Sequence, residues 1–274
     1  IKMNSKNIIT KLFLIAFSMI TQASFAQKIY VNVNAGYNFN SAPVSSRNSM
    51  SNGSSSTTYD RVDISLGKGT NIDAAFGYMF NKHFGSELGV SYLFGGTTII
   101  TNNSTSSKST TNFSSSMFRI MPSIILSTEL GKIHPYAKLG VIVGSGSHTQ
   151  TVENNFTNGS TNFTSTKYDG GFAFGYFSGF GANYKLNDKI SLFGEIRIIS
   201  MAYAPNKAEV TESKSNGIDM LPNMTIRDKQ TEYSDSYTDD NNSSSNTSVP
   251  RKSTKQSLPF SSIGVNLGIR YYLK

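Results

Sequence analysis

Apolar and polar residues alternate along much of the chain after Gln27, and this alternation predicts β-strands. In the last such stretch, apolar side chains take every second position: Ile263, Val265, Leu267, Ile269, Tyr271 and Leu273. Small or polar residues lie between them: Gly264, Asn266, Gly268 and Arg270. A period of two residues is that of a strand whose two faces meet different surroundings. We predict eight strands, at about 29–40, 70–80, 84–96, 116–128, 134–146, 170–186, 190–204 and 259–273.

Eight strands with one apolar face are compatible with two kinds of barrel, and side-chain volume separates them. A soluble, lipocalin-like barrel would place the apolar face inside, whereas a transmembrane barrel would place it against lipid. The interior of an eight-stranded barrel is only wide enough to be filled by side chains. The apolar face carries too many large residues for that space, and the opposite face is rich in glycine. We therefore predict an all-β fold, an eight-stranded antiparallel transmembrane barrel.

The connections between the predicted strands alternate between short and long. The short ones lie at about 81–83, 129–133 and 187–189, and the long ones at about 41–69, 97–115, 147–169 and 205–258. Outer-membrane barrels have short periplasmic turns and longer extracellular loops. We therefore expect the four long loops outside the cell. No run of about 18 apolar residues follows Gln27, so no transmembrane helix is predicted.

The composition looks too polar for a membrane protein until it is divided between barrel and loops. Mean hydropathy is −0.27, and Ser, Asn and Thr supply 92 of the 274 residues. In a barrel only alternate strand residues meet lipid, and the loops hold most of the polar excess, for example in 54–58, 102–107 and 241–246. Such stretches bury too little apolar surface to order themselves, so we expect mobile loops.

The first 26 residues have the three parts of a secretory signal peptide. Lys6 and Lys11 precede the apolar run 12–20, and Ser24-Phe25-Ala26 follows as a cleavage site. The run is about half the length that a membrane-anchoring helix needs. We expect cleavage before Gln27, which leaves 27–274 as one barrel domain and lowers the formal charge from +8 to +5, since residues 1–26 carry three lysines and no acid.

Composition also excludes several kinds of chemistry. The chain has no cysteine, which excludes disulfides, a thiol nucleophile, a cysteine-based zinc site and an N-terminal lipoprotein anchor. No cluster of Lys and Arg interleaved with aromatic residues remains after export, so nucleic acid is not an expected partner. We expect no cofactor.

The end of the chain carries a motif that resembles a known signal. Residues 266–273 follow the order polar, any, Gly, any, any, aromatic, any, apolar, through Asn266, Gly268, Tyr271 and Leu273. This resembles the β-signal by which the barrel-assembly machinery recognises the last strand of outer-membrane proteins. The chain departs from the pattern in one place, because it ends in Lys274.

With the signal peptide and the four long loops, the whole mature chain resembles the small OmpA/OmpX/OmpW-type barrels, the "outer membrane protein beta-barrel domain" families. The Phe-Ala-Gln ending of the signal peptide resembles those of Bacteroidota. The resemblance implies the outer membrane of a Gram-negative bacterium, with lipid, lipopolysaccharide and the assembly machinery as partners, and it brings no active site. No sequence follows Lys274 for the peptidoglycan-binding domain of full-length OmpA-type proteins, so that tether is expected to be absent.

Most strands carry an ionisable residue on the face predicted to point inward: Asp73, Glu87, Arg119, Lys138, Glu195, Arg197 and Arg270. An unpaired charge in a narrow interior is costly, so acids and bases there should pair. Strand adjacency suggests Glu87 with Arg119 and Glu195 with Arg270. Such a network could be a static plug or a gate across a small pore, and we favour the plug.

The remaining candidate chemistry is sparse. His83 and His134 fall at short turns, and His148, beside Ser147 and Thr149, is the single candidate base for a lipid-modifying enzyme at the outer rim. The acidic run 232–240 could bind calcium, but it lacks the EF-hand spacing and is expected to be a solvated loop.

We therefore expect a non-enzymatic surface protein whose barrel is a scaffold for loops that make adhesive, host or envelope contacts with an unknown extracellular partner. A narrow porin-like channel for small solutes is the first alternative, and a lipid enzyme at the rim is the second. Solute uptake into liposomes distinguishes the first two.

Overall fold

The computed structural model describes residues 28–41, 45–52, 57–238 and 246–273. The expected signal peptide lies outside these residues. Among the residues described, no helix is long and apolar enough to cross a membrane. The described helices are two short ones, the 3-10 helix η1 (Leu221–Asn223) and α2 (Ile226–Lys229), and nearly all the other regular structure is strand.

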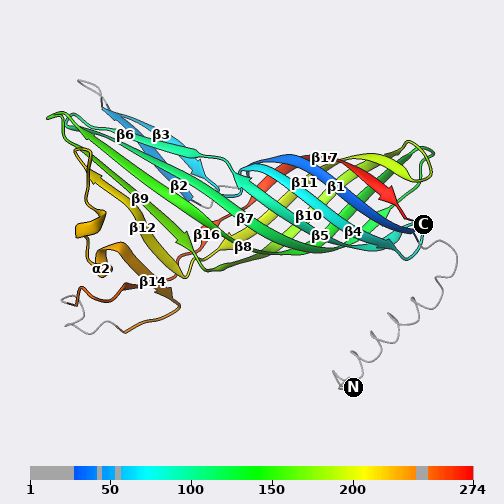
Figure 1. Ribbon diagram of the computed structural model, residues 1–274. Helices are drawn as coiled ribbons and strands as arrows, with labels where there is room; N and C mark the ends of the chain where they lie inside the picture. Colours follow the sequence, from blue (N-terminus) through cyan, green and yellow to red (C-terminus); the bar gives the residue numbers. More distant parts are fainter. Residues whose placement is uncertain (1–27, 42–44, 53–56, 239–245, 274) are drawn as a thin grey trace, which may run out of the picture.

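Eight strands form the closed barrel. They are β1 (Lys28–Asn40), β4 (Gly69–Met79), β5 (Phe84–Gly95), β7 (Ser107–Ser127), β8 (Ile133–Phe156), β10 (Phe172–Lys185), β11 (Ile190–Tyr203) and β17 (Ser262–Tyr272). Each pairs antiparallel with the next in this order, and β17 returns to β1 with Tyr272 opposite Tyr30. Closure leaves no unpaired sheet edge in the barrel wall. Both ends of the described chain lie at the same end of the barrel (Figure 1).

The outward face of the wall is apolar, as predicted. Large side chains such as Phe174, Leu267 and Val33 are more than half exposed on it. Edge-to-face aromatic pairs lie toward the loop end at Tyr37–Phe39 and Tyr92–Phe94, where centroids are 4.9 and 4.7 Å apart. Another pair, Tyr78–Phe80, lies at the opposite end. An apolar band flanked by aromatic residues is the expected form of a lipid-facing wall.

Two of the three short turns share one mechanism. In the turn between β4 and β5, the Asn81 side-chain oxygen accepts hydrogen bonds from the backbone N–H groups of His83 and Phe84, both at 2.8 Å. Asn187 does the same between β10 and β11, for Lys189 and Ile190 at 2.9 and 2.8 Å. An asparagine that satisfies two free N–H groups locally makes a tight turn stable.

The described parts of the long loops are largely ordered strands, which corrects the expectation that these loops do not order themselves. Their strands are β2 (Ser45–Asn52), β3 (Thr57–Ile64), β6 (Thr98–Asn103), β9 (Thr161–Asp169), β12 (Lys207–Ser215), β13 (Ile218–Asp219), β14 (Gln230–Ser234), β15 (Arg251–Thr254) and β16 (Leu258–Pro259). The polar run 102–107 includes the β6–β7 connection, whereas 53–56 and 239–245 lie outside the described residues.

These strands continue the barrel wall beyond its apolar band. Strand β7 begins nine residues before the predicted start, and β8 continues ten residues past the predicted end. They carry a sheet with the strand order β3-β2-β6-β7-β8-β9-β12-β14-β15, which we call the loop sheet. Figure 1 shows it extending away from the barrel on the side opposite the chain ends. The physical reason is that a neighbouring strand satisfies the backbone of a Ser/Thr-rich strand without needing an apolar core.

Two chain segments fold inward at the loop end of the barrel. The backbone N–H of Leu66 donates to the carbonyl of Pro259 at 2.9 Å, and that of Phe260 donates to Met201 at 2.9 Å. Gly67 lies so close to the Phe260 carbonyl oxygen that a Cβ atom there would be 2.2 Å from it. Glycine is therefore required where these two segments cross. Together they carry apolar side chains into the mouth of the barrel.

Candidate functional site: the barrel interior

The barrel interior is filled by three layers of side chains. Nearest the short turns is an apolar layer of Tyr30, Met79, Ile125, Tyr136 and Phe193. Above it lies a layer of charged residues, and nearest the loop sheet is a second apolar cluster that includes Leu66, Leu93, Met117, Phe177 and Phe260. We call this second cluster the loop-end plug. The order of the layers is the order in which inward-facing residues follow one another along each strand, from the short turns to the loop end.

Lys138 lies at the centre of the charged layer. Its Nζ atom is 2.6 Å from an oxygen of Glu87 and 3.0 Å from one of Glu195. Glu87 also accepts hydrogen bonds from the Tyr30 hydroxyl at 2.9 Å and the Asn32 amide at 2.8 Å. The two carboxylates therefore share one cation, and further donors satisfy Glu87. Such complete hydrogen bonding is what makes buried charges tolerable.

Arginines complete the layer on either side of this centre. Arg197 binds Asp73 at 2.6 Å and Glu195 at 2.7 Å. Arg270 lies over the ring of Tyr30, with its guanidinium carbon 4.1 Å from the centroid, and donates to Asn32 at 2.9 Å. Its Nη2 atom is 3.7 Å from Oε2 of Glu87. Stacking on an aromatic face compensates a buried guanidinium for part of its lost hydration.

Arg119 differs from the other bases of the layer. It is completely buried, and its Nε and Nη2 atoms both donate to the Ser91 hydroxyl, at 3.2 and 2.7 Å. Its Nη1 atom has no hydrogen-bond partner in the described structure. The layer holds three acids and four bases, so it carries one positive charge in excess when all are ionised.

The structure brings the inward charges together but not in the pairs expected from strand adjacency. Glu87 binds Lys138 rather than Arg119, and Glu195 binds Lys138 and Arg197 rather than Arg270. The expectation failed because the lumen is narrow. Side chains reach across it to strands that are not neighbours in the wall, as Glu87 on β5 does to Lys138 on β8.

Two tyrosines of the turn-end layer are parts of this site that sequence reasoning missed. A Cβ atom on Gly77 would lie 2.0 Å from the Tyr30 ring, and one on Gly181 would lie 2.7 Å from that of Tyr136. Both hydroxyls donate to the charged layer, Tyr136 to Glu195 at 3.1 Å. The glycine-rich inward face is the sequence signal that could have predicted them. A large ring fits inside the narrow lumen where the residue facing it is a glycine, which has no side chain.

The charged layer and the loop-end plug leave little free space. The cavity between them, lined by Asp73, Glu87, Met121, Lys138 and Arg197 among others, has a volume of about 20 Å³. That is room for about one water molecule. Side chains therefore nearly fill this part of the barrel interior.

The sequence matches a family that has this architecture. The profile described as "Outer membrane protein beta-barrel domain" matches residues 12–218, which is well over half of the chain. The chain is an outer membrane β-barrel protein. No curated protein sequence matches it significantly.

Solved structures of other outer-membrane proteins resemble this barrel at low identity. OprG from Pseudomonas aeruginosa is 13% identical, with a TM-score of 0.42, over 90% of this chain and 95% of that one. The corresponding values for Neisserial surface protein A are 12%, 0.37, 90% and 98%. For Ail, the attachment invasion locus protein of Yersinia pestis, they are 8%, 0.24, 90% and 96%. These values are too low to carry a property of those proteins over to this chain.

The outer-membrane barrel places the residues of the terminal motif on both faces of β17. Asn266 is fully buried and accepts a hydrogen bond from Asn71 at 2.9 Å, and Gly268 faces the lumen beside Asn34. Tyr271 and Leu273 point to the lipid side, where they are exposed. Every motif residue therefore has a place in the wall, and recognition by the assembly machinery stays a prediction.

The candidate base at the rim of this outer-membrane protein is not arranged as one. His148 points inward, 3% exposed, whereas its neighbours Ser147 and Thr149 lie on the opposite face of β8. Across the described ranges the Nδ1 atom of His148 has no hydrogen-bond partner, so nothing orients the ring through that nitrogen. Among the described residues there is also no group of three acids and histidines that could hold a metal ion. Asp239 and Asp240 of the acidic run lie outside those residues.

Proposed function

We propose that this outer-membrane protein is a non-enzymatic surface scaffold. Its filled barrel anchors the loop sheet, which presents contact surfaces outside the cell to a partner in the environment, the host or the envelope. The observation that carries the proposal is the filled lumen beneath an ordered extension. A cavity of about 20 Å³ within the barrel is too small for a solute path, so a narrow channel is not favoured.

The proposal requires the loop sheet to face outward, and single cysteines can test this. The chain has no cysteine, so an introduced thiol is the sole reactive one. Ser106→Cys and Asn158→Cys place a thiol at the tips of the β6–β7 and β8–β9 connections, whereas Lys82→Cys and Asp188→Cys place one in the short turns.

On intact cells, a membrane-impermeant maleimide should label the two tip variants, and the two turn variants should react only after lysis. Labelling of Lys82→Cys or Asp188→Cys from outside would invert the orientation and refute the proposal. Liposome swelling supplies the second test, because robust uptake of small sugars would favour a channel over a scaffold.

A further inference from the structure

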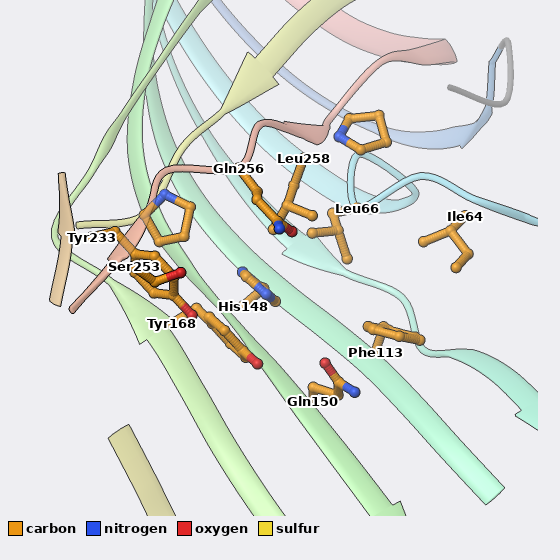
Figure 2. Close-up of a pocket in the computed structure, with 12 residues that line it drawn as sticks. Ile64, Leu66, Phe113, His148, Gln150, Tyr168, Tyr233, Ser253, Gln256 and Leu258 are labelled. Carbon is orange, nitrogen blue, oxygen red and sulfur yellow. The ribbon is translucent and has the colours of Figure 1, made fainter. Parts of the chain in front are cut away.

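A second cavity lies above the loop-end plug, between the barrel mouth and the loop sheet. Its volume is about 290 Å³, and its lining comes from β3, β7, β8, β9, β14, β15 and the segments near Pro205 and Pro259. Figure 2 shows His148, Gln150, Tyr168 and Phe113 around it. Ligand cavities in proteins span about 300–1,000 Å³. This one therefore fits a molecule of one or two rings and no larger.

His148 is placed and held as a ligand-binding group. Its ring stacks on that of Tyr168, with centroids 4.3 Å apart and planes within 8°, and meets the ring of Tyr203 edge-on at 6.4 Å. The Tyr203 hydroxyl is occupied by the Gly146 carbonyl at 2.8 Å. The imidazole is therefore held on two sides by aromatic rings.

The hydrogen-bonding state of His148 follows from its surroundings. Nδ1 is sealed from solvent and has no hydrogen-bond partner in the part of the chain that the structure describes. Buried N–H groups without a partner are rarer than bare acceptors, so the proton belongs on Nε2. That nitrogen is then the one that can donate into the cavity. Burial lowers the pKa of His148 to about 4, so the ring is neutral at physiological pH.

The lining also excludes a charged ligand. None of the twelve residues around the cavity is an acid, a lysine or an arginine. Apolar contact is offered by Leu66, Phe113 and Leu258, and the mouth is edged by Gln256, which is exposed. A buried anion or cation would find no partner here. A flat neutral molecule would find apolar contact from residues such as Leu66 and Phe113 and uncharged polar side chains, with His148 the buried one among them.

We propose that this cavity binds a small, neutral, one- or two-ring molecule that accepts a hydrogen bond from Nε2 of His148. This ligand site goes beyond the surface-contact role and is independent of it, because contacts made by the outer face of the loop sheet do not require the cavity to be filled.

Quinoline and naphthalene form a matched pair of probes. They have the same two-ring shape, but only quinoline carries a ring nitrogen that accepts a hydrogen bond. Binding is measured by equilibrium dialysis at pH 7.5 with the folded protein in lipid nanodiscs, and empty nanodiscs supply the correction for partition into lipid. The chain has three histidines, so ¹⁵N-histidine labelling also allows the His148 signal to be followed directly.

We expect quinoline to bind about tenfold more tightly than naphthalene and to shift the Nε2 resonance of His148, as a buried hydrogen bond predicts. His148→Phe keeps a flat ring against Tyr168 but removes the donor. It should lower quinoline affinity to that of naphthalene and leave naphthalene binding unchanged. His83→Phe, in a short turn at the far end of the barrel, is the control and should change neither.

Three results would overturn the ligand site. The first is equal binding of the two probes to the natural chain. The second is a quinoline preference that persists in a folded His148→Phe variant, and the third is no binding of either probe above empty nanodiscs. Heat-modifiable migration on a gel verifies that each variant is folded, so a misfolded variant is not counted as a loss of binding.

Discussion

At the scale of single residues, the contribution of a buried base to stability depends on how many carboxylates it contacts. Lys138 contacts two carboxylates, Glu87 and Glu195, whereas within the described residues Arg119 donates only to the Ser91 hydroxyl. Removing one partner of a buried ion pair leaves an uncompensated charge, whereas removing a poorly paired charge can be nearly neutral. The two residues should therefore differ sharply on substitution.

We expect Lys138→Met to lower the free energy of unfolding by about 3–5 kcal/mol, and Arg119→Met to lower it by less than about 2 kcal/mol. Urea unfolding in lipid vesicles, followed by heat-modifiable migration, measures both. Equal losses for the two variants would show that Lys138 does not hold the network together.

His148 gives a stability effect that depends on pH. Burial lowers its pKa to about 4 in the folded chain, from about 6.5 in the unfolded chain. The titratable side chains packed against it are those of Tyr168 and Tyr203, which carry no charge in this range. The unfolded chain therefore binds the proton more readily between pH 6.5 and 4. The contribution of neutral His148 to the free energy of unfolding is fully present above pH 6.5 and is lost as the pH falls toward 4.

The difference in unfolding free energy between the natural chain and His148→Phe isolates this contribution. As the pH falls from 6.5 to 4, the natural chain should lose up to about 3 kcal/mol of unfolding free energy relative to His148→Phe. Other groups that titrate in this range cancel in the difference. A difference that stays constant with pH would place His148 in a solvated site.

At the scale of elements, the loop sheet is where sequence reasoning fell short. The alternation of residues predicted the eight wall strands and their lipid-facing side, because lipid and lumen impose opposite demands on neighbouring residues. Beyond the membrane both faces of β7 and β8 are polar, so no periodicity marks them as strands. These strands pair through backbone hydrogen bonds, which the side-chain pattern does not reveal. Composition alone therefore predicted disorder.

Amide hydrogen exchange tests the order of this extension. Residues 108–113 of β7 pair with β6 on one side and β8 on the other. Their amides should exchange orders of magnitude more slowly than those of the connection 104–106. Equal exchange rates in the two stretches would restore the mobile loops that the composition predicts.

At the scale of the whole molecule, the barrel is closed at two levels. Charged side chains that reach across the lumen fill its middle, and two loop segments carrying Leu66 and Phe260 seal the loop end. The inward charges were predicted from sequence, but their partners were not, because partners across a narrow lumen depend on its diameter and on strand stagger. The residues of the loop-end plug were not all predicted, because Leu66, for example, lies in a segment that the sequence predicted to be a loop.

Single-channel recording in planar bilayers tests this closure most directly. The protein should show no openings above the bilayer background, and Arg119→Ala should not create any, because the loop-end plug and the remaining charged residues still fill the barrel. Stable openings in the natural chain, with a conductance that changes in Arg119→Ala, would contradict a closed scaffold and identify the charged layer as a gate.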